Sequence, residues 1–386
     1  MKRTVILILG AISLVVASVL AKPFVSPFVF PNLLGQYSVG SSYFHWIDDN
    51  RLETHAENKN TRRELMVRAW YPIQGVPKDS SKMAYAPSLV KYAKERSWLY
   101  TFSGVDRLKS HAYSSLPDGG IKVAPVLIYS HGLAGVGYEG NTALCEQLAS
   151  SGFVVFAINH TFSSLISEFP DGRRALNKIN TERKSYRERQ KIAEDEIEIW
   201  LEDIRFVVHK IEELVAKKAE FSFMDTKKLG VFGHSFGGAS AVKFCKQDMR
   251  CLVGANLDGA LFANEPDKEL KRPFLFMLGD ESIKRFMTPS EFEEDMLKRY
   301  ESREEERESM QKYLPAIDDL LEKMDGLGEK VVVQGADHGS FSDGPLLSKV
   351  SLLLSLDKGN SGSADPFLLH DTVSRKLIKF FRKHLE

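Results

Sequence analysis

Short apolar runs recur along the middle of the chain, each bounded by glycine, proline or polar residues. Their length and their β-branched and aromatic content predict buried strands at 125–129, 153–158, 229–232, 251–257, 273–278 and 331–333. Helix-forming patterns lie between or after them, at about 140–150, 181–214, 239–244 and 366–385. Such alternation of buried strands and helices predicts a largely parallel sheet covered by helices.

The flanking pattern is less regular. Residues 37–49 and 63–71 alternate as strands do, and we expect Pro72 to end the second strand. Residues 74–120 are mixed and polar, as in connecting structure or a lid. Charged, helix-forming residues dominate about 162–200 and 281–330, which we interpret as helical insertions.

A serine stands at the turn between one predicted strand and the helix that follows it. Residues 233–237 read GHSFG, which matches the G-x-S-x-G nucleophile elbow around Ser235. Glycines on both sides let the backbone bend sharply and leave the hydroxyl accessible. The alternative is a glycine-rich start of a helix that performs no chemistry.

A serine hydroxyl becomes a nucleophile when a base takes its proton. His338 follows a late strand in a glycine-flanked loop and is our candidate base, with His160 as the alternative at the end of another central strand. His209 falls in a predicted helix. His131 belongs to a loop of the oxyanion type, in which the backbone matters more than the imidazole ring. His234 lies inside the elbow, and we expect its side chain to point away from the site.

Two aspartates could orient the base. Asp258 ends the strand next in sequence after Ser235, and Asp280 ends the following one. Both positions suit the chain order Ser, Asp, His of α/β hydrolases. Position alone therefore does not decide which aspartate is the triad acid. Backbone N–H groups of Leu133 and Phe236 are the candidate donors to an oxyanion, because 131–133 resembles the HG-type loop of esterases.

The charge and cysteine counts exclude several classes of protein. The 386-residue chain has 52 basic and 52 acidic residues and a pI near 7.2, so nucleic acid is not an expected partner. Its three cysteines cannot all pair, although Cys245 and Cys251 are close enough to form a disulfide, and free thiols fit equally well. Spacing typical of metal ligands is absent among cysteine and histidine.

The N-terminus has the pattern of an export signal. Lys2 and Arg3 precede an apolar run over 5–20, and small residues at 19 and 21 predict cleavage of a signal peptide at 1–21. The protein would then be secreted or periplasmic, and an uncleaved membrane anchor is the alternative. Residues 23–34 are apolar and punctuated by proline, which predicts an extended segment that packs on the domain or touches a lipid interface.

Five sequence blocks together resemble the platelet-activating factor acetylhydrolase family, of the plasma and intracellular type II branch. They are RELMVRAWYP (63–72), YSHGLAGVG (129–137), GHSFGG (233–238), NLDGALF (256–262) and ADHGSFSD (336–343). The resemblance implies an α/β-hydrolase fold, which we expect as a single domain over 22–386. It implies Ser235, Asp258 and His338 as the triad, Leu133 and Phe236 as oxyanion donors, and no metal or cofactor.

The resemblance also implies a substrate class, namely short or oxidised acyl esters at the second position of phospholipids. A general carboxylesterase or polyester hydrolase is the first alternative. A hydrolase-fold binding protein without turnover is the second, and the complete set of candidate catalytic residues argues against it. The insertion at 281–330 and the residues around Asp258 depart from the animal enzymes, so the substrate itself is a hypothesis.

Overall fold

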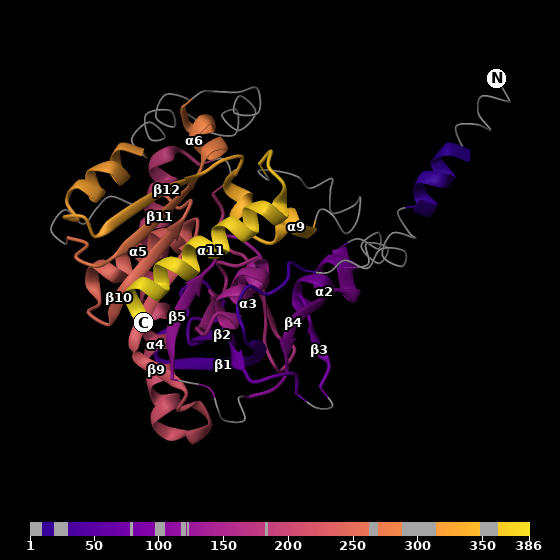
Figure 1. The fold of residues 1–386 in the computed structure, drawn as a ribbon, viewed down its shortest axis with the longest axis horizontal. Coiled ribbons are helices and arrows are strands. Elements are labelled where there is room, and N and C mark those ends of the chain that lie inside the picture. Colours follow the sequence, from indigo (N-terminus) through magenta and orange to yellow (C-terminus); the bar gives the residue numbers. More distant parts are fainter. Residues whose placement is uncertain are drawn as a thin grey trace.

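A ten-stranded sheet forms the middle of the protein (Figure 1). The structure, a computed structural model, describes residues 10–18, 30–77, 80–96, 105–116, 121, 123–181, 184–261, 269–287, 314–347 and 362–386. The strands lie in the order β12-β11-β10-β9-β5-β6-β2-β1-β4-β3. A separate two-stranded hairpin consists of β7 (Ile166–Glu168) and β8 (Arg174–Leu176).

Six adjacent strands at one side of the sheet run parallel to one another. They are β5 (Ala124–Ser130), β6 (Val154–Asn159), β9 (Met224–His234), β10 (Cys251–Leu257), β11 (Phe274–Gly279) and β12 (Gly328–Val333). The antiparallel pair β1 (Ser38–Leu52) and β2 (Arg62–Ile73) extends this sheet beyond β6, and β4 (Lys109–Tyr113) and β3 (Lys82–Ala84) complete it. Pro72 lies within β2 and does not end it, because it pairs with Val39 of the antiparallel neighbour.

Helices cover both faces of the sheet. Val126 and Ile128 of β5 pack in the same core cluster as α4 (Tyr186–Lys217) and α5 (Phe236–Gln247). Leu127 and Tyr129 pack in the cluster of α3 (Thr142–Ser150) and α11 (Pro366–Leu385), which lies across the front of the sheet in Figure 1. The alternation along one strand therefore separates two apolar layers, as expected for a sheet covered on both faces. This architecture confirms the predicted α/β-hydrolase fold.

Short helices connect the main elements. They are α2 (Pro87–Arg96), η2 (Val105–Arg107), η3 (Gly137–Asn141), η4 (Ala219–Phe221), α6 (Asp280–Met287), η5 (His338–Phe341) and α9 (Gly344–Leu347), and residues 314–322 are also helical. The β7–β8 hairpin and the start of α4 occupy the predicted insertion at 162–200. Of the predicted insertion at 281–330, residues 288–313 lie outside the described residues. The organisation of 22–386 as one domain stays a prediction.

The described part of the N-terminal segment packs against the protein. Phe30 is buried, and its ring centroid lies 4.7 Å from that of Tyr85. The N–H of Leu34 donates to the side chain of Gln147 in α3 at 2.8 Å. Residues 10–18 are helical, with exposed apolar side chains, whereas the rest of the predicted signal peptide and residues 22–29 lie outside the described residues.

A disulfide joins the end of α5 to the start of β10. Cys245 and Cys251 are bonded, with their Cα atoms 5.1 Å apart, whereas Cys145 is a buried free thiol. Sequence alone left this pairing open. The bond connects the helix that begins just after Ser235 with the strand that ends just before Asp258, so it ties together two elements that position candidate site residues.

Replacing both cysteines should measure this connection. Because the bond restricts a short loop in the unfolded chain, we expect the double variant Cys245→Ala/Cys251→Ala to lose about 2 kcal/mol of unfolding free energy. Chemical denaturation without reductant measures the loss. Reductant should lower the midpoint of the wild type and leave that of the double variant unchanged. Equal midpoints for the two proteins without reductant would contradict the prediction.

Candidate active site

Ser235 lies between the last residue of β9 and the first residue of α5. Its φ of 56° and ψ of −122° are seldom adopted by residues other than glycine. Its N–H donates to the carbonyl oxygen of Leu257, at the end of β10, at 2.9 Å. A Cβ at Gly237 would lie 2.1 Å from the carbonyl oxygen of Ser130, so the turn packs directly on the end of β5. These contacts hold the serine at the carboxyl edge of the parallel strands.

His338 joins the serine hydroxyl to a buried carboxylate. Its Nε2 lies 3.0 Å from Oγ of Ser235, and its Nδ1 lies 2.8 Å from Oδ2 of Asp258. Asp258 is ionised and can only accept, so Nδ1 donates and Nε2 is left to accept the hydroxyl proton. This is the tautomer that a general base requires. The structure therefore brings together the three residues that the sequence predicted as a triad.

The carboxylate of Asp258 accepts hydrogen bonds from three donors. It accepts hydrogen bonds from the N–H of Gly279 at 3.0 Å and from the hydroxyl of Ser282 at 2.7 Å, besides that from His338. Burial opposes ionisation, yet the hydrogen bond and charge of His338, followed by these two donors, keep the pKa of Asp258 below its ordinary value. The group is thus an ionised, fixed partner for the imidazole. Its φ of 54° marks a sharp turn directly after β10.

Asp280, the other candidate acid, faces a different partner. It begins α6, and its carboxylate pairs with Lys284 of the same helix at 2.9 Å. It also accepts a backbone hydrogen bond from Gly335, in the loop after β12, whereas the imidazole of His338 contacts Asp258. His160, the alternative base, is fully buried, with its ring nitrogens 2.8 Å from Asp203 and 3.1 Å from Ser130.

The two predicted oxyanion donors belong to segments that meet beside the nucleophile. A Cβ at Gly132 would lie 3.2 Å from Cβ of Ser235, so the loop after β5 touches the elbow. Leu133 packs in the same apolar cluster as Phe236, the first residue of α5, and Trp200 of α4. A backbone N–H at the start of α5 also benefits from the positive end of the helix dipole. Both segments therefore suit the stabilisation of negative charge near the hydroxyl.

A cavity of about 630 Å³ opens over the serine. Gly132, Leu133, Ser235 and His338 line it. Residues of α2 and of the segment 342–347 also line it, namely Leu89, Val90, Tyr92, Ala93, Arg96 and Leu347. Its size is that of a small-molecule site.

The helix α2 is attached to the protein at several points. The buried carboxylate of Glu139 accepts hydrogen bonds from the N–H groups of Ser88 and Leu89, at 3.2 and 2.8 Å, at the helix N-terminus. Lys91 forms an ion pair with Glu168 of β7. None of the residues of α2 is fully buried, although its apolar side chains line the cavity. The position of α2 therefore depends on these polar contacts and on the packing of Leu89 and Val90 against a buried apolar cluster. Hydrophobic periodicity did not reveal its role as a cavity wall.

One expectation about the elbow was wrong. The side chain of His234 does not point away: it lines the cavity, and its ring centroid lies 4.7 Å from that of His338. Its Nε2 donates to the carbonyl oxygen of His338 at 2.9 Å. Burial, and then the nearby His338, lower the pKa of His234 to about 3, so its ring is neutral at neutral pH. The contact spans 104 residues of sequence and is invisible to local pattern.

The residues that the structure describes contain no group of three histidine, cysteine, aspartate or glutamate side chains arranged as metal ligands would be. Within the same described ranges, each helix is too short or too polar to span a bilayer.

The sheet order, the elbow and the loops at the carboxyl edge place the protein in the α/β-hydrolase class. A ferulic acid esterase from Streptomyces cinnamoneus has a similar fold, with a TM-score of 0.70 and 22% identity over 92% of each chain. Residues 24–386 match the sequence profile of platelet-activating factor acetylhydrolase, isoform II, and the chain therefore belongs to this family.

Two curated relatives show how far this chain has diverged in sequence from other members of the family. The chain is 24% identical to the platelet-activating factor acetylhydrolase of Bos taurus over 260 residues, which is 60% of this chain and 57% of the relative. It is 23% identical to a probable 1-alkyl-2-acetylglycerophosphocholine esterase of Arthroderma benhamiae over 271 residues, or 64% and 63% of the two chains. The matches thus span less than two thirds of either relative.

The contact between the elbow and β5 can be tested by adding one methyl group. We expect Gly237→Ala to lower the unfolding free energy by about 3 kcal/mol, because its Cβ would overlap the carbonyl group of Ser130 and α5 would have to move. Denaturant titration measures the change. Gly344→Ala is the control, since its Cβ would meet its nearest neighbour at an ordinary 3.5 Å. Equal stability of the two variants would show that the elbow is less tightly packed than described.

Proposed function

We propose that the protein is a serine esterase that removes short or oxidised acyl groups from the second position of phospholipids resembling platelet-activating factor. The observation that carries the proposal is the hydrogen-bonded series Ser235, His338 and Asp258, whose serine opens into the cavity. Family membership and the names of the relatives support the substrate class.

The first half of the reaction acylates the serine. Oγ of Ser235 forms a bond to the ester carbonyl carbon while Nε2 of His338 takes the hydroxyl proton. The electron pair of the C=O double bond moves to its oxygen, which receives hydrogen bonds from the N–H groups of Leu133 and Phe236. When this intermediate collapses, the ester C–O bond breaks, and His338 returns the proton to the leaving alcohol, a lysophospholipid.

The second half releases the acyl group. His338 takes a proton from water as the water oxygen attacks the acyl-enzyme, and the intermediate again places negative charge at the two backbone donors. Its collapse frees the carboxylic acid, and the proton returns to Ser235. Asp258 remains ionised throughout and stabilises the imidazolium in both halves. Each oxyanion donor contributes roughly 3 kcal/mol of transition-state stabilisation.

The cavity wall supports a phospholipid substrate. Leu89, Val90 and Leu165 offer apolar contacts for an acyl chain, and Arg96 offers a permanent positive charge. The guanidinium of Arg96 donates to the hydroxyl of Tyr92 at 2.5 Å and lies over its ring. A guanidinium can bind a phosphate through two parallel hydrogen bonds. We therefore assign the part of the cavity beside Arg96, at the C-terminal end of α2, to the head group.

We also infer that the protein is exported. The disulfide between Cys245 and Cys251 suits an oxidising compartment. Residues 10–18 form a helix with exposed apolar side chains, in keeping with a signal peptide over 1–21 or with an N-terminal anchor. If the helix remains attached, it would keep the enzyme at a lipid surface.

The triad can be tested with an acetyl group at the second position of a phospholipid and with p-nitrophenyl acetate. We expect Ser235→Ala to abolish turnover of both, and Asp258→Asn to lower kcat about 10⁴-fold, because His338 would lose the acceptor that sets its tautomer. Asp280→Asn is the matched control and should keep its activity.

Three outcomes would change the proposal. Loss of activity in Asp280→Asn with retention in Asp258→Asn would overturn the assigned acid. If the wild type cleaves only the soluble ester, the protein is a general carboxylesterase or polyester hydrolase, and the phospholipase assignment is wrong. Complete resistance of the wild type to a serine-directed phosphonate would point to a binding protein.

Arg96 tests the phospholipid assignment separately. We expect Arg96→Gln to raise KM for the phospholipid several-fold more than KM for p-nitrophenyl acetate, because the soluble ester has no phosphate. Lys94→Gln is the control on the same helix, where Lys94 pairs with Asp106 at 2.8 Å. Steady-state kinetics of both variants with both substrates measure the difference, and equal changes in the two KM values would remove Arg96 from head-group recognition.

A further inference from the structure

The peptide between Gly132 and Leu133 is held by its carbonyl oxygen. This oxygen lies 2.7 Å from Nδ1 of His131 and accepts the N–H of Gly135 at 2.9 Å. The peptide is planar and trans, so the carbonyl of Gly132 and the N–H of Leu133 point in opposite directions. Whatever fixes the carbonyl oxygen therefore also fixes the direction of the predicted oxyanion donor.

The partners of His131 define its tautomer. The carbonyl oxygen of Gly132 can only accept a hydrogen bond, and the N–H of His160, 3.2 Å from Nε2, can only donate one. The proton of the imidazole is therefore on Nδ1, and Nε2 is an acceptor. Burial lowers the pKa of His131 to about 3, which keeps the ring neutral at the pH of most esterase reactions.

Aromatic contacts fix the plane of this ring. Trp200 of α4 stacks on the ring of His160, with centroids 3.8 Å apart and an angle of 9° between the planes. The same indole meets His131 edge-on at 4.9 Å and Phe236 at 4.8 Å. One tryptophan thus contacts the support of one proposed donor and the residue that supplies the other.

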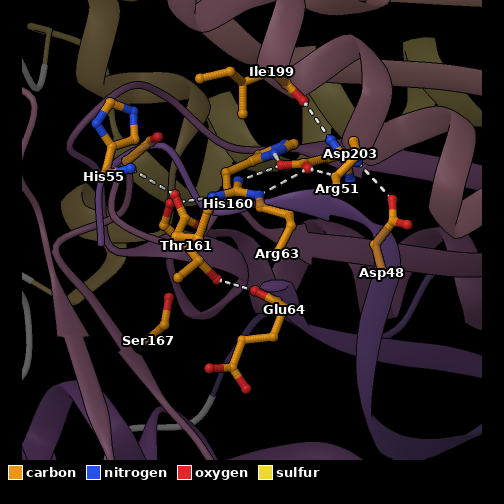
Figure 2. Close-up of polar contacts among 12 residues, drawn as sticks. Asp48, Arg51, His55, Arg63, Glu64, His160, Thr161, Ser167, Ile199 and Asp203 are labelled. Carbon is orange, nitrogen blue, oxygen red and sulfur yellow. Dashed lines mark hydrogen bonds and ion pairs between the residues drawn. The ribbon is translucent and has the colours of Figure 1, made fainter. Parts of the chain in front are cut away.

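A buried ionic network holds His160 (Figure 2). Nδ1 of His160 lies 2.8 Å from Asp203, whose carboxylate receives two hydrogen bonds from Arg63, at 3.0 and 2.5 Å. Arg63 also donates to the carbonyl oxygen of Thr161 at 2.9 Å and to Glu53 at 2.6 Å. Asp203, Arg63 and His160 are all buried, so the backbone N–H that contacts His131 belongs to a rigid segment.

We propose that His131 is a positioning residue of the esterase: its Nδ1–H fixes the carbonyl of Gly132 and thereby directs the N–H of Leu133 to the oxyanion. The network of Arg63, Asp203 and His160 holds the imidazole in place. The inference rests on the proposed esterase function. It gives the ring of His131 a role in addition to that of the loop backbone.

Two substitutions separate the two hydrogen bonds of the ring. In His131→Asn the side-chain amide can take the place of Nδ1 and donate to Gly132, while the bond from His160 is lost. In His131→Gln the amide reaches the place of Nε2 and can accept from His160, while the bond to Gly132 is lost. A purely structural role in packing would make the two variants similar.

We expect kcat of His131→Gln to fall at least about tenfold, because a complete oxyanion donor accounts for about 10²–10³-fold in kcat. Its KM should stay near that of the wild type, since the donor acts on charge that develops in the transition state. His131→Asn should recover most of kcat, even if its unfolding free energy is lower. The experiment uses p-nitrophenyl acetate and the full chain, with circular dichroism and denaturant titration of each variant.

Several results would overturn the inference. Wild-type kcat in His131→Gln would show that the bond to Gly132 is dispensable, and equal losses in both variants would assign the effect to packing. If either variant fails to fold, the tautomer of His131 in the wild-type protein tests the inference instead. Long-range ¹H–¹⁵N correlations of the imidazole show which ring nitrogen carries the proton. A proton on Nε2 contradicts the inference, and a proton on Nδ1 supports it.

Different experimental results would contradict this inference and the proposed esterase function. If Ser235→Ala is inactive and both His131 variants behave like the wild type, only the role of His131 is lost. If Ser235→Ala keeps full activity, the serine mechanism itself is wrong.

Discussion

The close contact between the nucleophile elbow and the end of β5 is the constraint on which the site depends. Gly237 leaves no room for a side chain against the carbonyl group of Ser130, and Ser235 adopts a strained φ in order to make this turn. Strain of this kind persists only where the surrounding structure determines it completely. Here the N–H of Ser235 is also bonded to Leu257. The hydroxyl is consequently placed by three adjacent strands of the sheet.

The parallel sheet explains how distant residues meet at this point. Ser235, Asp258 and His338 each follow the carboxyl end of a parallel strand, so their loops share one edge of the sheet. Adjacent loops then reinforce one another: Ser282 of α6 donates to Asp258, and His234 of the elbow donates to the backbone of His338. The catalytic geometry is therefore a property of the strand order, and the flanking loops adjust its details.

Sequence could predict the parts of the site that depend on local pattern. The elbow around Ser235 and the glycine-flanked His338 have short signals, and their chain order is informative. Asp258 and Asp280 could not be separated by position, because both follow parallel strands of the same sheet, and the family resemblance selected Asp258. The direction of the His234 ring and the pairing of Arg63 with Asp203, 140 residues apart, depend on packing between distant segments and have no local signal.

The buried ionic network is better explained by rigidity than by stability. Removing Arg63 and Asp203 from water is costly, and buried ion pairs often add little to the unfolding free energy compared with apolar residues of similar size. Their hydrogen bonds are nevertheless directional and leave few alternative arrangements. Because the network ends at the backbone of His160, it restricts the segment that contacts His131. An oxyanion donor is effective when it is already oriented before charge develops, and a rigid polar support satisfies that requirement.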